Sequence, residues 1–254
     1  MAILYVASEA AELKPFAQLL TGVRKLNWPV DYAFEGILDG KRMLLAANGA
    51  GPKLAAHVVE TALRAAMAAE LSSSRLEAVV STGFCGALDD SLALSDIVVA
   101  DKVICPEETD VFDCAPINTS TPHASGTVLS QNRVANTAEE KRKLGGLGAV
   151  AVDMEAGGVA RRAKRAGLPF CCIKVVTDCA HDSFPFDVNG MRTPEGRIAR
   201  GKILIHALAR PALLPALFKL KRCTENAAMR LGDFLASCRI VSEPVEHGTD
   251  PVRL

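Results

Sequence analysis

The sequence predicts a single α/β domain over residues 1–254, with a mixed central sheet flanked by helices on both faces. Short apolar runs suited to buried strands alternate with longer segments of helical periodicity. Glycine-rich and acidic motifs follow these apolar runs, as expected where ligands bind at the carboxyl ends of strands. A chain of 254 residues with 49% apolar side chains is also long enough to bury a core without disulfides or metal.

The individual elements follow from periodicity and turn residues. Helices are expected over residues 10–20, 53–69 and 155–165, the first because Leu13, Phe16 and Leu20 recur at helical spacing. Asp39-Gly40 is a strong signal for a two-residue hairpin. Residues 106–148 are less regular and are expected to form excursions around the core. Strands are expected over residues 3–7, 32–38, 41–47, 77–81, 96–100, 150–153 and 170–177.

Composition excludes several classes of function. The 29 basic and 29 acidic residues balance, which argues against a nucleic-acid partner, as does the 5% share of aromatic residues. None of the 8 cysteines lies in a pair with zinc-ligand spacing, so we expect reduced thiols and no metal. The sequence shows neither a signal peptide nor an uncharged apolar run long enough to span a membrane, so a cytoplasmic protein is expected.

The C-terminal part, about residues 199–240, is predicted to be a basic, apolar helical segment. Between residues 199 and 222 there are six basic residues and no acidic one, among Leu, Ile and Phe. Two interpretations stay open. The segment is either a helix packed on the sheet with a solvated basic face, or a peripheral contact with anionic lipid.

Three acidic residues are candidates for catalysis. Glu12 follows the first strand, Glu155 lies where a strand becomes a helix, and Asp178 ends the next strand. If those two strands are adjacent and parallel, Glu155 and Asp178 share one rim of the sheet. Carboxylates held close together raise one another's pKa, which provides an acid and a base near neutral pH. Structural roles remain alternatives: a helix cap for Asp178, a helix-dipole contact for Glu155 and plain surface charge for Glu12.

Taken together, the motifs resemble the nucleoside phosphorylase superfamily, which contains phosphorylases and nucleosidases. Val152-Asp153-Met154-Glu155-Ala156, followed by Thr177-Asp178, is the more specific signature. The stretch from Ser81 to Ala87, followed by the stretch from Ser95 to Asp101, is similar to a second one. Asn48-Gly49-Ala50-Gly51 looks like the family's early glycine-rich turn. Glu12 falls where the 5′-methylthioadenosine/S-adenosylhomocysteine nucleosidases carry a glutamate. The resemblance covers about residues 1–190.

The resemblance implies the cleavage of a purine N-glycosidic bond through a ribosyl cation. Asp178 would protonate N7 of the base and Glu12 would activate water, as in inverting glycosidases. Glu155 would hold the ribose hydroxyls, and Met154 would pack on the sugar. The resemblance implies no cofactor and favours a homo-oligomer, with a dimer for nucleosidases. Other substrate-binding residues are expected at Val152, Asp153, Gly83, Phe84, Phe184 and Phe186. Phe184 and Phe186 would line the pocket around the 5′ end of the ligand.

Departures from the family pattern favour water over phosphate. The stretch after the first strand lacks the Gly-Asp-Pro-x-Arg motif of phosphorylases, and Ser81 stands where these enzymes carry a phosphate-binding arginine. Phe84 replaces a small hydroxyl residue, and Lys174 either contacts an anion or pairs with an acid. The first hypothesis is therefore a nucleosidase for a 5′-substituted adenosine. A phosphorylase, possibly for an adenosylated lipid, and a non-catalytic nucleoside-binding protein are the alternatives.

Overall fold

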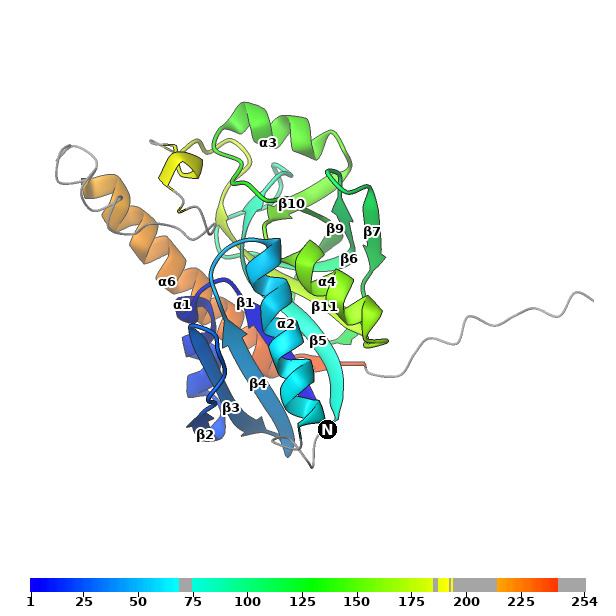
Figure 1. The fold of residues 1–254 in the computed structure, drawn as a ribbon. Coiled ribbons are helices and arrows are strands. Elements are labelled where there is room, and N and C mark those ends of the chain that lie inside the picture. Colours follow the sequence, from blue (N-terminus) through cyan, green and yellow to red (C-terminus); the bar gives the residue numbers. More distant parts are fainter. Residues whose placement is uncertain (69–74, 185–186, 192, 194–213, 242–254) are drawn as a thin grey trace, which may run out of the picture.

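The computed structural model confirms a mixed sheet with helices on both faces (Figure 1). It describes residues 1–68, 75–184, 187–191, 193 and 214–241, with the backbone alone for 214–220. The strands of the main sheet run in the order β10-β9-β6-β11-β5-β1-β4-β3-β2, and β7 pairs with β6. Their bounds are β1 Ala2–Ala7, β2 Thr21–Lys25, β3 Tyr32–Leu38, β4 Lys41–Ala47, β5 Leu76–Ala87, β6 Ile97–Cys105, β7 Asp110–Asp113, β9 Ala124–Ser130, β10 Ala149–Asp153 and β11 Phe170–Asp178.

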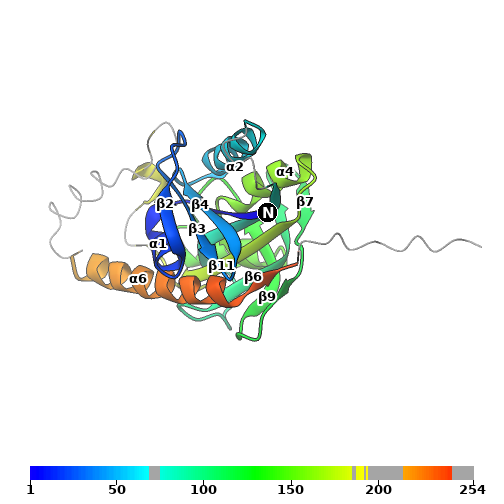
Figure 2. The same cartoon turned by 90° about the horizontal axis from the view of Figure 1, so that it is seen from below.

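Two helical layers cover the sheet. Helices α2 (Pro52–Met67) and α4 (Ala156–Arg165) pack together on one face, and α1 (Ala10–Gln18) and α6 (Leu214–Ser237) pack together on the other (Figure 2). Strand β1 shows the resulting pattern, because Leu4 joins the core under α2 and α4 while Tyr5 joins the core under α1 and α6. A strand buried on both faces reads as a continuous apolar run, which is why it was recognisable in the sequence.

The central strands close into a ring that the sequence did not predict. Strand β11 pairs with β5 in parallel, whereas β10 pairs with the far end of β5 in antiparallel fashion. Strands β10 and β11 are therefore not neighbours, so the condition of two adjacent parallel strands is not met. Both border β5 instead, so Glu155 and Asp178 still reach one end of the sheet.

Strand β5 is longer than expected. It was predicted to end at Ser81, with the following glycine-rich stretch as a turn, but the strand continues to Ala87. Gly83 has a φ of 113°, which bends the strand without ending it. Beyond this bend, Gly86 pairs with Val152 of β10. The glycine-rich stretch thus lies inside the sheet and forms a floor next to the strand ends.

The segment 106–148 contains more regular structure than expected. Strand β9 lies inside the sheet, between β6 and β10, and α3 (Ala138–Gly145) packs against β10. The strand was missed because only Val128, Leu129 and Ser130 are buried in it, and it lacks a long apolar run. Two short strands, β8 (Ile117–Asn118) and β12 (Arg239–Ile240), pair with each other in a separate antiparallel sheet. A short 3-10 turn, η1, covers Asn189–Met191.

The predicted hairpin is confirmed. Asp39 and Gly40 have φ values of 49° and 75° and join β3 to β4 as a two-residue hairpin, with Leu38 opposite Lys41. All eight cysteines are free thiols. Within the described part of the chain, no helix has both the length and the apolar character needed to cross a membrane.

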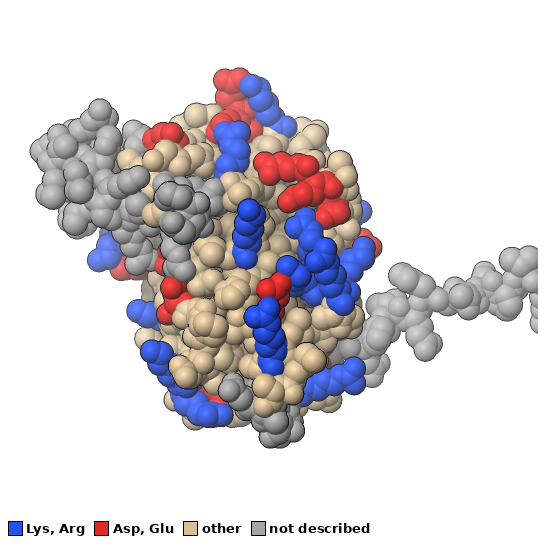
Figure 3. Space-filling view, in the orientation of Figure 1, with Lys and Arg blue, Asp and Glu red and all other residues tan. Residues whose placement is uncertain are grey.

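Surface charges of both signs lie next to each other on the face seen in Figure 3. Arg161 of α4, for example, pairs with Glu108 and Asp110 beside β7. The C-terminal basic segment is described only in part. Lys221 and Arg222 of α6 are exposed, whereas residues 199–213 lie outside the described residues, so a membrane contact there stays an untested expectation.

Candidate active site

A pocket of about 420 Å³ lies at the carboxyl ends of the strands. Its lining comes from the ends of β1, β4, β10 and β11, from the bent part of β5, and from the loops that precede α3 and follow β11. The predicted residues on its wall are Glu12, Phe84, Val152, Asp153, Met154, Glu155, Asp178 and Phe184. One concave site thus collects residues that are far apart in the sequence.

Glu12 is a buried carboxyl held at the start of α1. It accepts hydrogen bonds from the Ser8 amide at 2.9 Å and from the Ser8 hydroxyl at 2.8 Å, and it closes a capping box with Glu9. Only 3% of the residue is exposed, which excludes the alternative of a plain surface charge. Burial raises the pKa of Glu12 to about 7, against the Ser8 hydrogen bonds and the charge of Lys174. The pKa of Glu12 therefore lies close to the value that suits a general base at neutral pH.

Gly83 is the neighbour that makes room for Glu12. A Cβ at this position would lie 2.5 Å from Oε2 of Glu12, and the φ of 113° is one that side chains rarely adopt. Gly83 therefore contributes to the site by its lack of a side chain, with the Glu12 carboxyl resting against its backbone.

Glu155 lies at the N-terminus of α4, with 5% of the residue exposed. Its Oε1 accepts a hydrogen bond from the Gly51 amide at 2.8 Å, so the early glycine-rich turn and the Asp-Met-Glu motif meet here. Burial, with Asp153 and Glu12 nearby, raises the pKa of Glu155, against the charge of Lys174. The carboxyl group keeps Oε2 for a further partner in the pocket.

Asp153 and Lys174 form a fully buried ion pair with 2.6 Å between Oδ2 and Nζ. The same Asp153 oxygen accepts the amides of Glu155 at 3.2 Å and Ala156 at 2.9 Å, which caps α4. Lys174 also donates to the Thr82 carbonyl at 3.1 Å. Burial lowers the pKa of Lys174, but the charge of Asp153 outweighs it, and the net shift is upward. Of the two alternatives left open for Lys174, the structure shows pairing with an acid.

Asp178 ends β11 and is paired with a residue that the sequence did not single out. Its Oδ2 forms an ion pair with Nζ of Lys141, and its Oδ1 accepts the Thr177 hydroxyl at 3.1 Å. Burial raises the pKa of Asp178, and the ion pair with Lys141 opposes that shift. A Cβ on Gly86 would lie 2.8 Å from Oδ2, so this carboxyl group also rests on a glycine of β5.

Apolar side chains complete the pocket. Phe84 lines it and packs against the core under α1 and α6, while Met154, Val152 and Phe184 contribute from other sides. Phe186 lies outside the described residues. Sequence reasoning missed Arg133, Val134 and Ala135, which precede α3, and Thr224 of α6. No motif marks them, and their places follow from the long-range packing of segment 106–148 and of α6.

Comparison with known proteins decides the family. A family model described as the phosphorylase superfamily matches residues 2–125 and 117–209. The chain belongs to the phosphorylase superfamily. This confirms the family that the motifs predicted. Together with the nucleosidases among the similar proteins, it confirms the predicted class of enzyme, one that cleaves N-glycosidic bonds.

The similar proteins include several nucleosidases. The 5′-methylthioadenosine/S-adenosylhomocysteine nucleosidases of Mycobacterium bovis and Mycobacterium tuberculosis are 26% identical over 202 residues, which cover 61% of this chain and 76% of theirs. A nucleosidase structure from S. pneumoniae with a transition-state inhibitor has a TM-score of 0.67 at 17% identity and covers 93% of this chain and 97% of its own. Futalosine hydrolase of Helicobacter pylori has the same TM-score and identity, covering 93% and 96%.

Within this member of the phosphorylase superfamily, the pocket wall holds a single basic residue among those described. Arg133 is paired with Glu140, and Ser81 is fully buried with its hydroxyl unpartnered in the described structure. The described residues also contain no group of three or more His, Cys, Asp or Glu side chains placed to hold a metal ion.

Proposed function

We propose that this protein is a purine nucleosidase that cleaves the N-glycosidic bond of a 5′-substituted adenosine by attack of water. The observation that carries the proposal is a pair of carboxyl groups on one pocket wall, the buried Glu12 with a pKa of about 7 and the partly buried Asp178 with a raised pKa. They rest on two glycines of the same strand, Gly83 and Gly86. This arrangement supports one group as base and the other as acid.

In the proposed reaction, the bond between C1′ and the purine nitrogen breaks and its electron pair goes to the base. Asp178 gives its proton to N7, which makes the purine a neutral leaving group. Glu12 accepts a proton from water as the water oxygen forms its bond to C1′. The products are the free purine and the 5′-substituted ribose, and the division of work is that of an inverting glycosidase.

Glu155 is assigned to the ribose. The Gly51 amide occupies one of its oxygens, which leaves the other to accept hydrogen bonds from the sugar hydroxyls. A carboxylate in this position stabilises the positive charge that develops on the sugar. Met154 contributes apolar contact with the sugar, Phe84 and Val152 add to the pocket wall, and Asp153 acts by fixing the start of α4.

Phosphorolysis is the second candidate, because the family model is that of phosphorylases. It is less well supported here. A phosphate ion needs cationic donors, and the basic side chain described on the pocket wall, Arg133, is already paired with Glu140. When ionised, Glu12 would also repel a phosphate. The nucleosidase and futalosine hydrolase names among the similar proteins agree with water as the nucleophile.

Free purine release tests the proposal. Methylthioadenosine, adenosylhomocysteine, adenosine and inosine are supplied in phosphate-free buffer and again with phosphate. We expect adenine release without phosphate, and a decrease of about 10²–10⁴-fold in Asp178→Asn, the range for a positioned acid. Glu12→Gln should stop hydrolysis but still bind ligand, while the exposed Glu107→Gln serves as a control. Purine release only with phosphate would favour a phosphorylase. The absence of release from all four nucleosides would favour a non-catalytic binding protein or a larger, lipid-linked substrate.

Two wider expectations also stay proposals. We expect a homodimer, as the resemblance to nucleosidases implies, and a cytoplasmic protein. Light scattering of the purified chain tests the first, and cell fractionation tests the second. Recovery with the membrane fraction would instead support a lipid contact through residues 199–222.

A further inference from the structure

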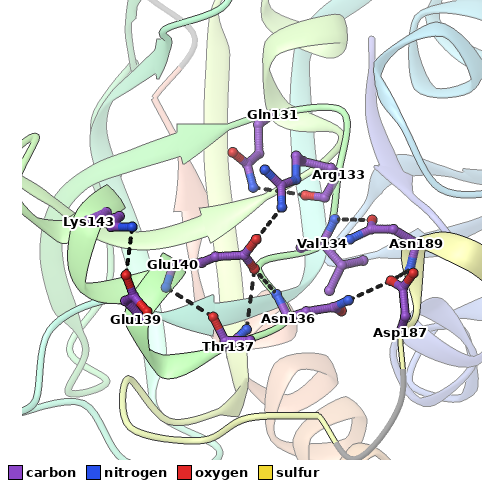
Figure 4. Close-up of polar contacts among 10 residues, drawn as sticks. All are labelled: Gln131, Arg133, Val134, Asn136, Thr137, Glu139, Glu140, Lys143, Asp187 and Asn189. Carbon is purple, nitrogen blue, oxygen red and sulfur yellow. Dashed lines mark hydrogen bonds and ion pairs between the residues drawn. The ribbon is translucent and has the colours of Figure 1, made fainter.

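Lys141 is a buried cation that the proposed reaction does not yet use. It lies on α3 among charged residues, and its neighbours Glu139 and Lys143 pair with each other at the surface (Figure 4). Lys141 points the other way and is completely buried. A lysine is almost never fully buried unless it is paired. Its burial therefore calls for a specific partner.

That partner is Asp178. The ammonium group of Lys141 forms an ion pair with Oδ2 of Asp178 and donates to the Cys179 carbonyl at 2.7 Å. The ring of Phe184 lies 5.8 Å from Nζ and adds a cation–π contact. These contacts come from the last residue of β11 and from two residues that follow the strand. Lys141 is thus fixed on the carboxyl group to which the proposed function assigns the base-protonating step.

Lys141 is not among the residues that line the pocket, whereas Asp178 is. Its contact with the pocket wall is therefore through Asp178. Lys141 holds Oδ2 of Asp178. The remaining oxygen, Oδ1, accepts a hydrogen bond from the Thr177 hydroxyl. That hydroxyl also lies 3.3 Å from the Cys85 carbonyl, so it has a second acceptor when Oδ1 carries a proton.

We propose that Lys141 is a positioning residue for Asp178: it holds Oδ2, directs Oδ1 toward the base, and sets the upper pH at which the carboxyl group keeps its proton. This inference rests on the proposed function, because it needs Asp178 to be the acid. A cation close to a carboxyl group favours the ionised form, so Lys141 makes Asp178 release its proton more readily.

The charges around Asp178 give the direction of the effect. Burial raises the pKa of Asp178, Lys141 and the Thr177 hydroxyl lower it, and Asp182 raises it. Cys85 of β5 and Cys179 are further titratable groups near Asp178, and Arg133, Asp153 and Glu155 lie on the same pocket wall. Without the charge of Lys141, the pKa of Asp178 is expected to rise further.

The start of α3 is built to hold Lys141 in place. Thr137 and Glu140 form a capping box, in which the Glu140 amide donates to the Thr137 hydroxyl at 3.2 Å. Glu140 also accepts the Asn136 amide at 2.7 Å and pairs with Arg133 (Figure 4). The Asn136 side chain donates to Asp187 at 2.7 Å, which ties this loop to the segment after β11.

The binding of free adenine as a function of pH tests this inference without the water-activating step. A protonated Asp178 donates to N7, so the dissociation constant should rise about tenfold per pH unit above the pKa of Asp178. In Lys141→Met this rise is expected to begin one to three pH units higher, the usual effect of a nearby opposite charge. Lys141→Arg should follow the unmodified protein. Lys143→Met is the matched control, because Lys143 lies on the same helix but is exposed.

A second measurement is independent of adenine. Carbon-13 NMR of labelled aspartates, with the Asp178 signal assigned by Asp178→Asn, gives its titration directly. If adenine fails to bind but the Asp178 titration moves upward in Lys141→Met, the proposed function is wrong and the coupling stands. If the titration and the adenine profile keep their pH position while binding weakens uniformly, Lys141 has only a structural role and the inference fails. If Lys141→Met does not fold, Lys141→Gln replaces it, because its side-chain amide provides an uncharged N–H donor for the Cys179 carbonyl.

Discussion

The contact between Gly83 and Glu12 shows how one missing side chain shapes the site. The Glu12 carboxyl rests where a Cβ at position 83 would be, and the backbone of Gly83 adopts a φ of 113°. A larger residue at position 83 would therefore be unfavourable for two reasons, a steric clash with Glu12 and a strained backbone conformation. The steric penalty acts on the reaction, because the atom that must move is an oxygen of the proposed base.

We expect Gly83→Ala to lower kcat for purine release at least tenfold, since Glu12 would be displaced from the water it activates. Gly22→Ala is the control that separates the two penalties. Gly22 also has a positive φ, of 60°, but its Cβ would meet nothing within 4 Å. Both variants should lose about 1–2 kcal/mol of unfolding free energy from backbone strain, measured by urea titration. Unchanged turnover in Gly83→Ala would show that Glu12 is not held by this contact.

Single residues were predictable where a motif marked them. Glu12, Glu155 and Asp178 were found because they stand in short signatures, and the structure brings all three to one pocket. Lys141 had no such signal. It lies in a run of charged residues, Glu139 to Lys143, that is typical of a solvated helix face. Only the packing of α3 over the end of β11 shows which of these charges points inward.

At the scale of elements, positions were predicted better than ends. Strands β1, β3 and β4 and helices α2 and α4 were found within a few residues, because apolar periodicity and turn residues are local signals. The end of β5 was misplaced because its glycines bend the strand instead of closing a turn. Strand β2 was missed since all five of its residues are exposed, which leaves no apolar pattern.

Helix α3 provides a prediction at this scale. Glu140→Ala removes the acceptor for Asn136 and Thr137 and the partner of Arg133, so the first turn of α3 should loosen. We expect a loss of about 1–2 kcal/mol in unfolding free energy, as for other helix caps, together with a lower kcat/KM through Lys141.

Glu139→Ala is the matched control for this change. Glu139 is the preceding residue and is fully exposed, with a surface partner in Lys143. Hydrogen exchange of the α3 amides should increase in Glu140→Ala and remain unchanged in Glu139→Ala. Equal protection in the two variants would mean that the capping box does not fix the helix.

For the whole molecule, the mixed sheet was predictable and its closure was not. Alternation of strands and helices indicates an α/β fold. The ring formed by β5, β10, β9, β6 and β11 depends on pairing between segments that are far apart in the sequence, such as Gly86 with Val152. This closure brings the ends of β10 and β11 to the same part of β5, and it gathers several carboxyl groups in one pocket.

That burial has a consequence for the stability of the whole fold. The pKa of Glu12 is raised from its ordinary value of 4.5 to about 7, and the pKa of Glu155 is raised as well. The folded state thus binds these protons more tightly than the unfolded chain does. The contribution of each group to stability is complete below pH 4.5, and it is lost as the pH rises through about 7 for Glu12 and through about 8 for Glu155. For Glu12 alone it amounts to roughly 3 kcal/mol.

The unfolding free energy, measured by urea titration, should therefore fall between pH 5 and pH 8. Glu12→Gln removes the titrating group but keeps the shape, so this fall should become smaller by up to roughly 3 kcal/mol. The exposed Glu107→Gln should keep the full pH dependence. A pH dependence in Glu12→Gln as steep as in the unmodified protein would mean that Glu12 titrates alike in the folded and unfolded chain. Glu12 would then lack the proton affinity that suits a base at neutral pH.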